Sequence, residues 1–196
     1  HLRAALLAAL ERTRGITRFT GRRVVTQATD DARAQVTLDD DTTLQGRILI
    51  GADGRRSGTA ERAGIGRDVT DYGQTALVCA IGHDRPHDGI AHQLFLPPGP
   101  LAILPLTGNR SSIVWSEETD QAAAIQALSD DDYLRVLRPR FGDFLGPIHI
   151  AGARYTYPLN LTLAKSFTAE RLALVGDAAR GVHPIAGQGL NAGLRD

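Results

Sequence analysis

The first fifty residues combine one helical pattern with several short alternating runs. Leu2, Leu6 and Leu10 recur at the spacing of one face of a helix. Polar residues at 39–42 form a turn before an apolar run that ends at Gly51. The alternation predicts strands at residues 16–19, 23–27, 34–38 and 44–50. We therefore expect a small β-meander that leads into a buried strand.

The middle of the chain has the pattern of an antiparallel sheet followed by helices. Strands are predicted at residues 75–81, 92–96, 101–106 and 111–115, because these apolar runs are separated by Gly, Pro and Asn. Helical spacing is found at 57–63, 121–128 and 131–137, with Ser57, Ser129 and Asp130 as candidate caps and Pro139 as a stop. Two further strands are predicted at 153–158 and 171–175.

Composition excludes several classes of protein. Lys and Arg total 22 and Asp and Glu total 22, so no net charge favours binding to nucleic acid. The single cysteine, Cys79, lies in an apolar run, where a buried, inert thiol in a reducing compartment is expected. His83, His87 and His92 lack the accompanying ligands of a metal site, and we predict none. Without a bilayer-length apolar run or a signal peptide, a cytoplasmic or peripheral location is expected.

The strongest chemical signal lies near the end of the sequence. Gly176 and Asp177 follow an apolar strand, where a glycine lets the backbone approach a ligand and a carboxylate can bind a sugar hydroxyl. The Gly187-Gln188-Gly189 run is expected to open a helix whose free N–H groups face an electron-rich group. Either half alone is common in α/β proteins. The two halves together, with His183-Pro184 between them, favour a cofactor site.

This segment resembles the "GD" motif of class A flavin monooxygenases, in the His-Pro-Ile-Ala-Gly-Gln-Gly-Leu-Asn form of ubiquinone-biosynthesis hydroxylases. The resemblance implies contact with the ribityl chain, the pyrophosphate and the isoalloxazine ring of FAD. It assigns these contacts to Gly176, Asp177, Pro184, Gly187, Gln188, Gly189, Leu190 and Asn191.

A second run, Gly51-Ala52-Asp53-Gly54, is similar to the same family's "DG" motif. An isolated Asp-Gly pair usually marks only a turn. Its place after an apolar strand, and its spacing from the GD motif, match the family. The resemblance therefore assigns Asp53 and Gly54 to the FAD-binding surface and, less firmly, Arg55, Arg56 and Ser57. Arg56 can equally be a solvated surface charge.

Weaker likenesses extend over most of the chain, and some features depart from the family. Residues 72–76 and 99–106 and Trp115 resemble the substrate sheet of the ubiquinone branch. Arg180 stands where many relatives have His, and Ala192 where a larger apolar residue is common. The Gly-x-Gly-x-x-Gly fingerprint is absent, and the chain contains no Met. We therefore expect an internal fragment that lacks the N-terminal unit and the C-terminus.

The implied fold is mixed α/β: part of a Rossmann-like FAD-binding domain with an inserted antiparallel β-sheet substrate domain. Residues 1–70 and 156–196 are assigned to the FAD-binding domain, and residues 71–155 to the substrate domain.

The implied parent protein is a monooxygenase that uses FAD, NADH or NADPH, and O2 to hydroxylate a phenol, expected to be polyprenylated. Peripheral association with the inner membrane or with a biosynthetic complex follows from that substrate class. No side chain is assigned as a catalytic acid or base, and the fragment alone is expected to be inactive. Two alternatives remain: a related flavin monooxygenase or halogenase acting on another aromatic or polyketide substrate, and a non-catalytic, degenerate flavoprotein.

Overall fold

The computed structural model describes residues 2–196, which form two compact units. The first unit comprises the residues up to Ile50 together with Thr168–Ala173. The second unit comprises Gly51–Phe167 and Leu174–Asp196, and it contains both motif segments and the large sheet. Each unit is described separately below.

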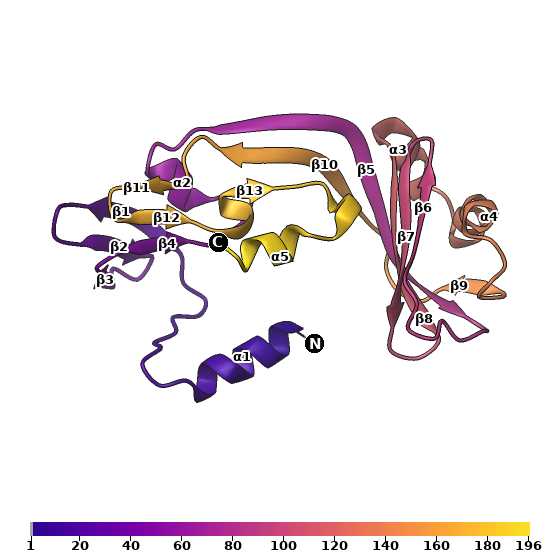
Figure 1. Ribbon diagram of the computed structural model, residues 1–196, viewed down its shortest axis with the longest axis horizontal. Coiled ribbons are helices and arrows are strands. Elements are labelled where there is room, and N and C mark those ends of the chain that lie inside the picture. The colour runs from indigo at the N-terminus through magenta and orange to yellow at the C-terminus, as the bar shows by residue number, and fades with distance from the viewer. Residues whose placement is uncertain (1) are drawn as a thin grey trace. The chain divides into compact units, whose positions relative to one another are not determined.

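Runs of strands are separated by helices, as expected for a mixed α/β chain (Figure 1). In chain order they are α1 (Leu2–Arg12), β1 (Val24–Thr29), β2 (Ala34–Leu38), β3 (Thr43–Gly46), β4 (Leu49–Gly51), α2 (Gly58–Arg62), β5 (Arg67–His83), β6 (His92–Leu96), β7 (Gly99–Leu106), β8 (Arg110–Glu118), α3 (Thr119–Gln126), α4 (Asp130–Phe141), β9 (Ile148–Ile150), β10 (Tyr155–Ala164), β11 (Thr168–Ala169), β12 (Leu172–Leu174), η1 (Gly176–Ala178), β13 (Arg180–Gly181), η2 (Pro184–Ala186) and α5 (Gly189–Gly193).

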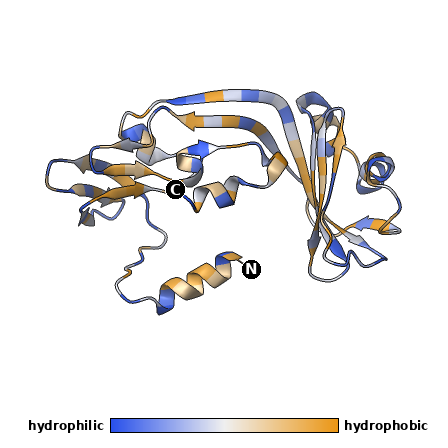
Figure 2. Cartoon of the chain, viewed as in Figure 1, coloured by the Kyte–Doolittle hydropathy of each residue, from blue (hydrophilic) through white to orange (hydrophobic). Residues whose placement is uncertain are grey.

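The first unit contains the predicted meander. Strands β1, β2 and β3 form an antiparallel sheet in that order. Helix α1 forms as predicted but buries no residue, and the orange parts of its ribbon in Figure 2 mark its hydrophobic residues. The predicted strand at 16–19 was wrong, because these residues adopt no regular structure and pair with no described strand.

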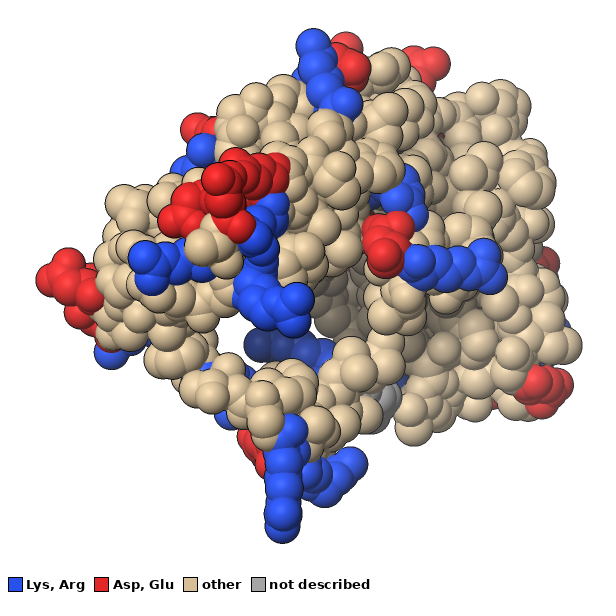
Figure 3. Space-filling model, turned by 60° about the vertical axis from the view of Figure 1, so that its left-hand side comes forward, with Lys and Arg blue, Asp and Glu red and all other residues tan. Residues whose placement is uncertain are grey.

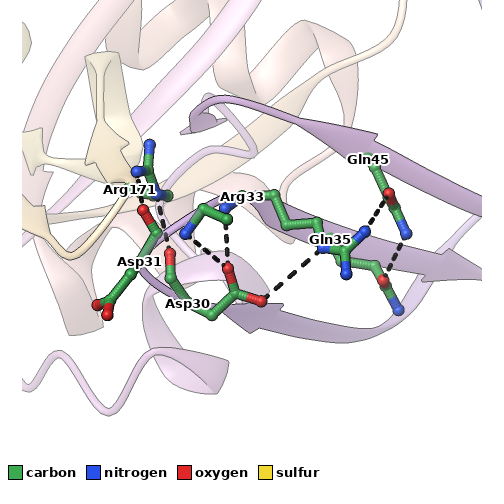
Figure 4. Close-up of polar contacts among 7 residues, drawn as sticks. Asp30, Asp31, Arg33, Gln35, Gln45 and Arg171 are labelled. Carbon is green, nitrogen blue, oxygen red and sulfur yellow. Dashed lines mark hydrogen bonds and ion pairs between the residues drawn. The ribbon is translucent and has the colours of Figure 1, made fainter.

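Hydrogen bonds from Arg171 link the start of β12 to the β1–β2 turn (Figure 4). Its Nε donates to the carbonyl oxygen of Asp30 at 2.8 Å, and its guanidinium also donates to the carbonyl of Asp31. A further bond reaches the carbonyl of Arg47 at 3.1 Å. Arg171 has a φ of 48°, in the left-handed region that strands do not use. For this reason β12 begins at Leu172 and is shorter than the predicted strand.

The second unit is built on a seven-stranded antiparallel sheet. The strand order is β13-β10-β5-β8-β7-β6, and β9 also pairs with β5. Strand β5 is much longer than predicted, since its first half pairs with β10 as a two-stranded ribbon (Figure 1). The register jumps from Leu159↔Gln74 to Asn160↔Asp71, so Tyr72 and Gly73 form a bulge in β5.

Helices α3 and α4 cover one face of this sheet and enclose its core. Trp115 and Tyr133 are fully buried, with ring centroids 5.9 Å apart in an edge-to-face arrangement. Cys79 is buried beside them, and burial raises the pKa of its thiol, as expected for an unreactive cysteine. Burial of each large apolar side chain here contributes about 1.5–3 kcal/mol. The predicted antiparallel sheet with its own core is therefore confirmed.

The prediction that Pro139 ends α4 was wrong. The helix continues to Phe141, whose side chain is buried in the core. A proline this close to the end removes one N–H donor from the last turn, and the apolar contact of Phe141 compensates for that loss. The helix ends at Gly142, which has a φ of 81° that favours glycine.

We predict that Arg171→Ala destabilises the first unit by about 1–3 kcal/mol, because three backbone carbonyls lose a charged donor. Amide hydrogen exchange of residues 24–38 measures the loss. Arg171→Gly is the matched comparison, since it removes the same side chain but relieves the left-handed backbone. Equal protection in wild type and in Arg171→Ala would contradict the assigned role.

Candidate functional site

The two motif segments begin side by side in the second unit. The backbone N–H of Val175 donates to the carbonyl oxygen of Gly51 at 2.9 Å, so both turns start from adjacent backbone. Gly51 is required by this approach, because an added Cβ would lie 2.8 Å from side-chain atoms of both Leu174 and Thr59. Two segments that are far apart in sequence thus form one surface.

The carboxylate of Asp53 binds residues of its own turn. Its carboxylate accepts hydrogen bonds from Ser57 Oγ at 2.5 Å and from the Thr59 backbone N–H at 2.9 Å. Ser57 Oγ in turn accepts from the backbone N–H of Ala60 and caps α2, as predicted. Partial shielding from water is the largest influence on the Asp53 pKa and raises it, but the bonds from Ser57 and Thr59 together hold the pKa below its usual value.

Arg55 links the first motif to the second. Its Nε pairs with Asp177 Oδ2 at 3.1 Å, and its Nη2 donates to the carbonyl oxygen of Val182 at 2.9 Å. Its Nη1 donates to Asn160 Oδ1 at 3.2 Å. Gly181 lies against this guanidinium, and an added Cβ there would be 2.7 Å from Arg55 Nε. The sequence pointed to Arg55 only weakly, whereas the structure gives it the most partners of any residue in the DG segment.

The Asp177 carboxylate is partly open to solvent. Its side chain is 46% exposed, and the backbone carbonyl of the same residue accepts from Arg67 Nη2 at 3.0 Å. The Nε and Nη1 atoms of Arg67 are buried and have no hydrogen-bond partner. Gly176 has a φ of 60°, and an added Cβ would have no heavy atom within 4 Å. Open backbone, an exposed carboxylate and unpaired cationic donors therefore occur together.

Two residues that sequence reasoning did not assign support the GD segment. Asp196 accepts from the Gly176 backbone N–H at 2.7 Å and pairs with Arg180 at 2.5 Å. The Gly176 N–H is the main reason that the Asp196 pKa lies below its usual value. Arg180 also donates to the Ala192 carbonyl at 3.2 Å, so the residue that departs from the family pattern connects α5 to this turn.

The last helix begins two residues later than predicted. Gly187 is left-handed, with a φ of 59°, and ends the short helix η2, while Gln188 takes the N-cap position of α5. Leu190 and Asn191 are exposed. Gly193 lies so close to the GD turn that an added Cβ would be 3.0 Å from Gly176 Cα. The glycines of this segment are therefore of two kinds, some facing open space and one packed against backbone.

A cavity of about 590 Å³ lies along the β5–β10 ribbon. Arg55, Arg56 and Arg67 line one part of it, and no Asp or Glu is among its described lining residues. The remaining lining residues are largely apolar and come from β5, β8, β10 and η2: Val69, Ala76, Val78, Val114, Tyr157, Pro158, Leu159, Asn160, Thr162 and Pro184. Of the firmly assigned cofactor residues, only Pro184 lines this cavity.

The features around the two motifs fit a bound dinucleotide cofactor. Gly54, Gly176 and Gly187 each have a positive φ and no heavy atom within 4 Å of an added Cβ, so ligand atoms can approach the backbone there. Unpaired N–H donors on Arg67 are suited to electron-rich acceptors. The Asp177 carboxylate is suited to a sugar hydroxyl.

The described residues provide neither a metal-binding cluster nor a membrane-spanning helix. Within residues 2–196, no group of three or more His, Cys, Asp or Glu side chains is arranged to hold a metal ion. No helix in the described part of the chain is long and apolar enough to cross a membrane. Basic and acidic side chains are interspersed over the face drawn in Figure 3.

Comparison with known proteins defines the class. The whole chain, residues 1–196, matches the family described as "FAD binding domain". The chain therefore belongs to this family of FAD-dependent monooxygenases, as the resemblance of its motifs implied.

Several of the similar curated proteins are enzymes of ubiquinone biosynthesis. The chain is 47% identical to ubiquinone hydroxylase UbiL of Rhodospirillum rubrum over 195 residues, which cover 100% of this chain and 46% of that protein. It is 34% identical to the mitochondrial ubiquinone biosynthesis monooxygenase COQ6 of Mus musculus, with 82% of this chain and 41% of that protein covered. The chain thus spans less than half the length of these relatives.

Solved structures agree on the fold. PqsL of P. aeruginosa in complex with 2-aminobenzoylacetate matches with a TM-score of 0.83 and 24% identity, over 98% of this chain and 55% of that one. The flavin-dependent halogenase CmlS matches with a TM-score of 0.82 and 21% identity, over 97% of this chain and 37% of that one. The predicted mixed α/β fold is confirmed, and at these identities the likeness extends to the fold alone.

We predict that Asp53→Asn weakens the DG turn at neutral pH and has little effect in acid. A carboxylate whose pKa is lowered by folding stabilises the folded state above its unfolded pKa of about 3.9, and this contribution is lost as pH falls through the folded value. Urea unfolding at pH 7 and at pH 3 measures the difference between wild type and variant. A difference that stays constant with pH would contradict the prediction.

Gly193→Ala is predicted to destabilise the second unit by about 1–3 kcal/mol, because the new methyl group would press on the Gly176 backbone. Gly189→Ala is a control within the same helix: its Cβ would meet only Val182 Cγ2, at 4.0 Å. There the gain in helix propensity leaves stability unchanged or slightly higher. Thermal unfolding of both variants tests the contrast, and equal melting temperatures would refute it.

Proposed function

We propose that the complete polypeptide carrying this chain is an FAD-dependent monooxygenase that hydroxylates the aromatic ring of a ubiquinone precursor. NADH or NADPH supplies the electrons and O2 the oxygen atom. The observation that carries the proposal is the joining of the two motif segments into one surface through the Val175–Gly51 bond and the Arg55–Asp177 pair. The similarity to UbiL and COQ6 supports the substrate class.

The proposed roles of the residues follow from their geometry and from the resemblance of the motifs. Asp177 accepts from a ribityl hydroxyl, while Gly54, Gly176 and Gly187 leave room for the cofactor beside the backbone. Gln188, Gly189, Leu190 and Asn191 border the flavin ring together with Pro184. Asp53 acts from within its turn by holding Gly54 and Arg55 in place.

The bound flavin would supply the oxygen chemistry, and the chain's own residues would orient the phenol and exclude water. The apolar lining from β5, β8 and β10 suits a ring with an apolar substituent, such as a prenyl chain. With such a substrate, the complete protein would work at the membrane surface or within a biosynthetic complex. In this proposal residues 71–155 form the substrate domain and the flanking segments belong to the FAD-binding domain.

We expect the complete polypeptide to retain FAD and Asp177→Ala to weaken that binding by about 10–100-fold, the loss of one charge-assisted hydrogen bond. Flavin fluorescence during titration measures the dissociation constant. Asp131→Ala is the control, because it removes an exposed carboxylate from α4. A wild-type protein that binds no flavin would refute the proposal.

Substrate class is tested separately, by NAD(P)H oxidation and product analysis with prenylated and unprenylated phenols. Preference for a prenylated precursor with formation of its hydroxylated product is the expected result. Preference for an unrelated aromatic compound would leave a flavin monooxygenase of different specificity.

A further inference from the structure

A chain of hydrogen bonds connects the sheet to the segment that begins at His183. Gln74 Nε2 donates to the carbonyl oxygen of Pro98 at 2.7 Å, and Gln74 Oε1 lies 3.2 Å from His183 Nε2. On the other side of the ring, His183 Nδ1 accepts the backbone N–H of Ile185 at 3.0 Å. The resemblance gave no role to His183 or Gln74.

These contacts fix the tautomer of His183. A backbone N–H can only donate, so Nδ1 must be unprotonated to accept it from Ile185. The ring proton of neutral His183 therefore lies on Nε2 and points at Gln74 Oε1. The Gln74 amide cannot turn over without losing its bond to Pro98, because its Nε2 is the atom that donates there.

The local fold keeps the Gln74 amide in this orientation. The Tyr72–Gly73 bulge precedes Gln74 in β5, and the Tyr72 ring meets the His183 ring edge-on, with centroids 5.3 Å apart. Gly99 leaves the space that the amide occupies, since an added Cβ would lie 3.1 Å from Gln74 Nε2. Bulge, glycine and carbonyl thus combine to present a single acceptor to the imidazole.

His183 is the N-cap of η2, so this tautomer determines how Pro184–Ala186 is held. A second glutamine holds the same segment independently: Gln93 Nε2, from β6, donates to the carbonyl of Ile185 at 2.9 Å. Ile185 is therefore fixed at its N–H through His183 and at its carbonyl through Gln93. Only the first of these two contacts depends on a titratable group.

We propose that Gln74 and His183 are positioning residues: Gln74 selects the Nε2–H tautomer of His183, and that tautomer holds Pro184–Ala186 in place beside the flavin ring. Protonation of His183 places a second proton on Nδ1, opposite the Ile185 N–H, and breaks the N-cap. The role toward flavin rests on the proposed function, whereas the tautomer does not.

The surroundings of His183 favour its neutral form. Burial lowers the pKa of the imidazole. Tyr72 is the titratable side chain in contact with the ring, and Arg55 donates to the carbonyl of the preceding residue, Val182. Because folding lowers the pKa of His183, the neutral ring contributes its full stability above the unfolded pKa of about 6.5. That contribution is lost as the pH falls from there through the folded pKa.

The tautomer is tested by 15N NMR of histidine-labelled protein, using the complete polypeptide without FAD. The expected spectrum shows protonated Nε2 and unprotonated Nδ1 for His183, assigned by comparison with His183→Asn. In Gln74→Ala a mixture of tautomers is expected. A wild-type ring protonated on Nδ1 at neutral pH would overturn the proposal, whether or not the protein binds FAD.

The effect on the cofactor segment is tested by the FAD dissociation constant between about pH 5 and pH 8. Binding by wild type is expected to weaken as His183 becomes protonated. Gln74→Ala should weaken binding about 3–10-fold at neutral pH, the loss of one hydrogen bond. His183→Asn keeps an acceptor near the Nδ1 position but does not titrate, so its binding should lack this pH dependence.

Gln93→Ala is the matched control, because it loosens the same segment without touching the imidazole. It should weaken FAD binding yet keep the wild-type pH dependence. A pH dependence that persists unchanged in His183→Asn would refute the positioning role, and so would its loss in Gln93→Ala. If wild type binds no flavin, the proposed function fails. The NMR measurement still tests whether Gln74 selects the Nε2–H tautomer of His183.

Discussion

The candidate site depends on one guanidinium. Arg55 spreads its planar set of donors over Asn160 in β10 and over the Asp177 carboxylate and the Val182 carbonyl in the GD segment. A lysine could not replace it, since an ammonium concentrates its donors at one point. Gly181 leaves the space that the guanidinium occupies, because any larger residue there would collide with it. Residues 55 and 181 therefore constrain each other, and the Arg55–Asp177 pair joins the two motifs together with the Val175–Gly51 bond.

This arrangement separates the two motif aspartates by function. Asp53 directs its carboxylate into its own turn, where Ser57 and Thr59 satisfy it, so it shapes the backbone. Asp177 is exposed to solvent, and its carboxylate pairs with Arg55. Two residues that look equivalent in a motif thus do different work: one holds the turn and the other remains available to a ligand.

The sequence predicted local features better than long-range ones. Strands β6, β7 and β8 were found because their apolar alternation is bounded by glycine, proline and asparagine. The length of β5 could not be read in the same way, since its first half is stabilised by pairing with β10 and much of it is exposed. The left-handed Arg171 was hidden for a related reason: its three carbonyl partners lie more than a hundred residues away in sequence.

The same limit applied to the chemistry of the site. The motifs gave the positions of Gly176 and Asp177, but nothing local indicated that Arg55, Arg67 and Asp196 would meet them, because these contacts join distant segments. Net charge gave no hint either, since 22 basic and 22 acidic residues cancel. Charges in water are screened within about 10 Å at 0.1 M salt, so a ligand responds to the nearby groups and not to the total. Arg55 is paired with Asp177, but Arg56 and Arg67 line the same cavity and no Asp or Glu is among its described lining residues, so the lining is cationic in a chain that is neutral overall.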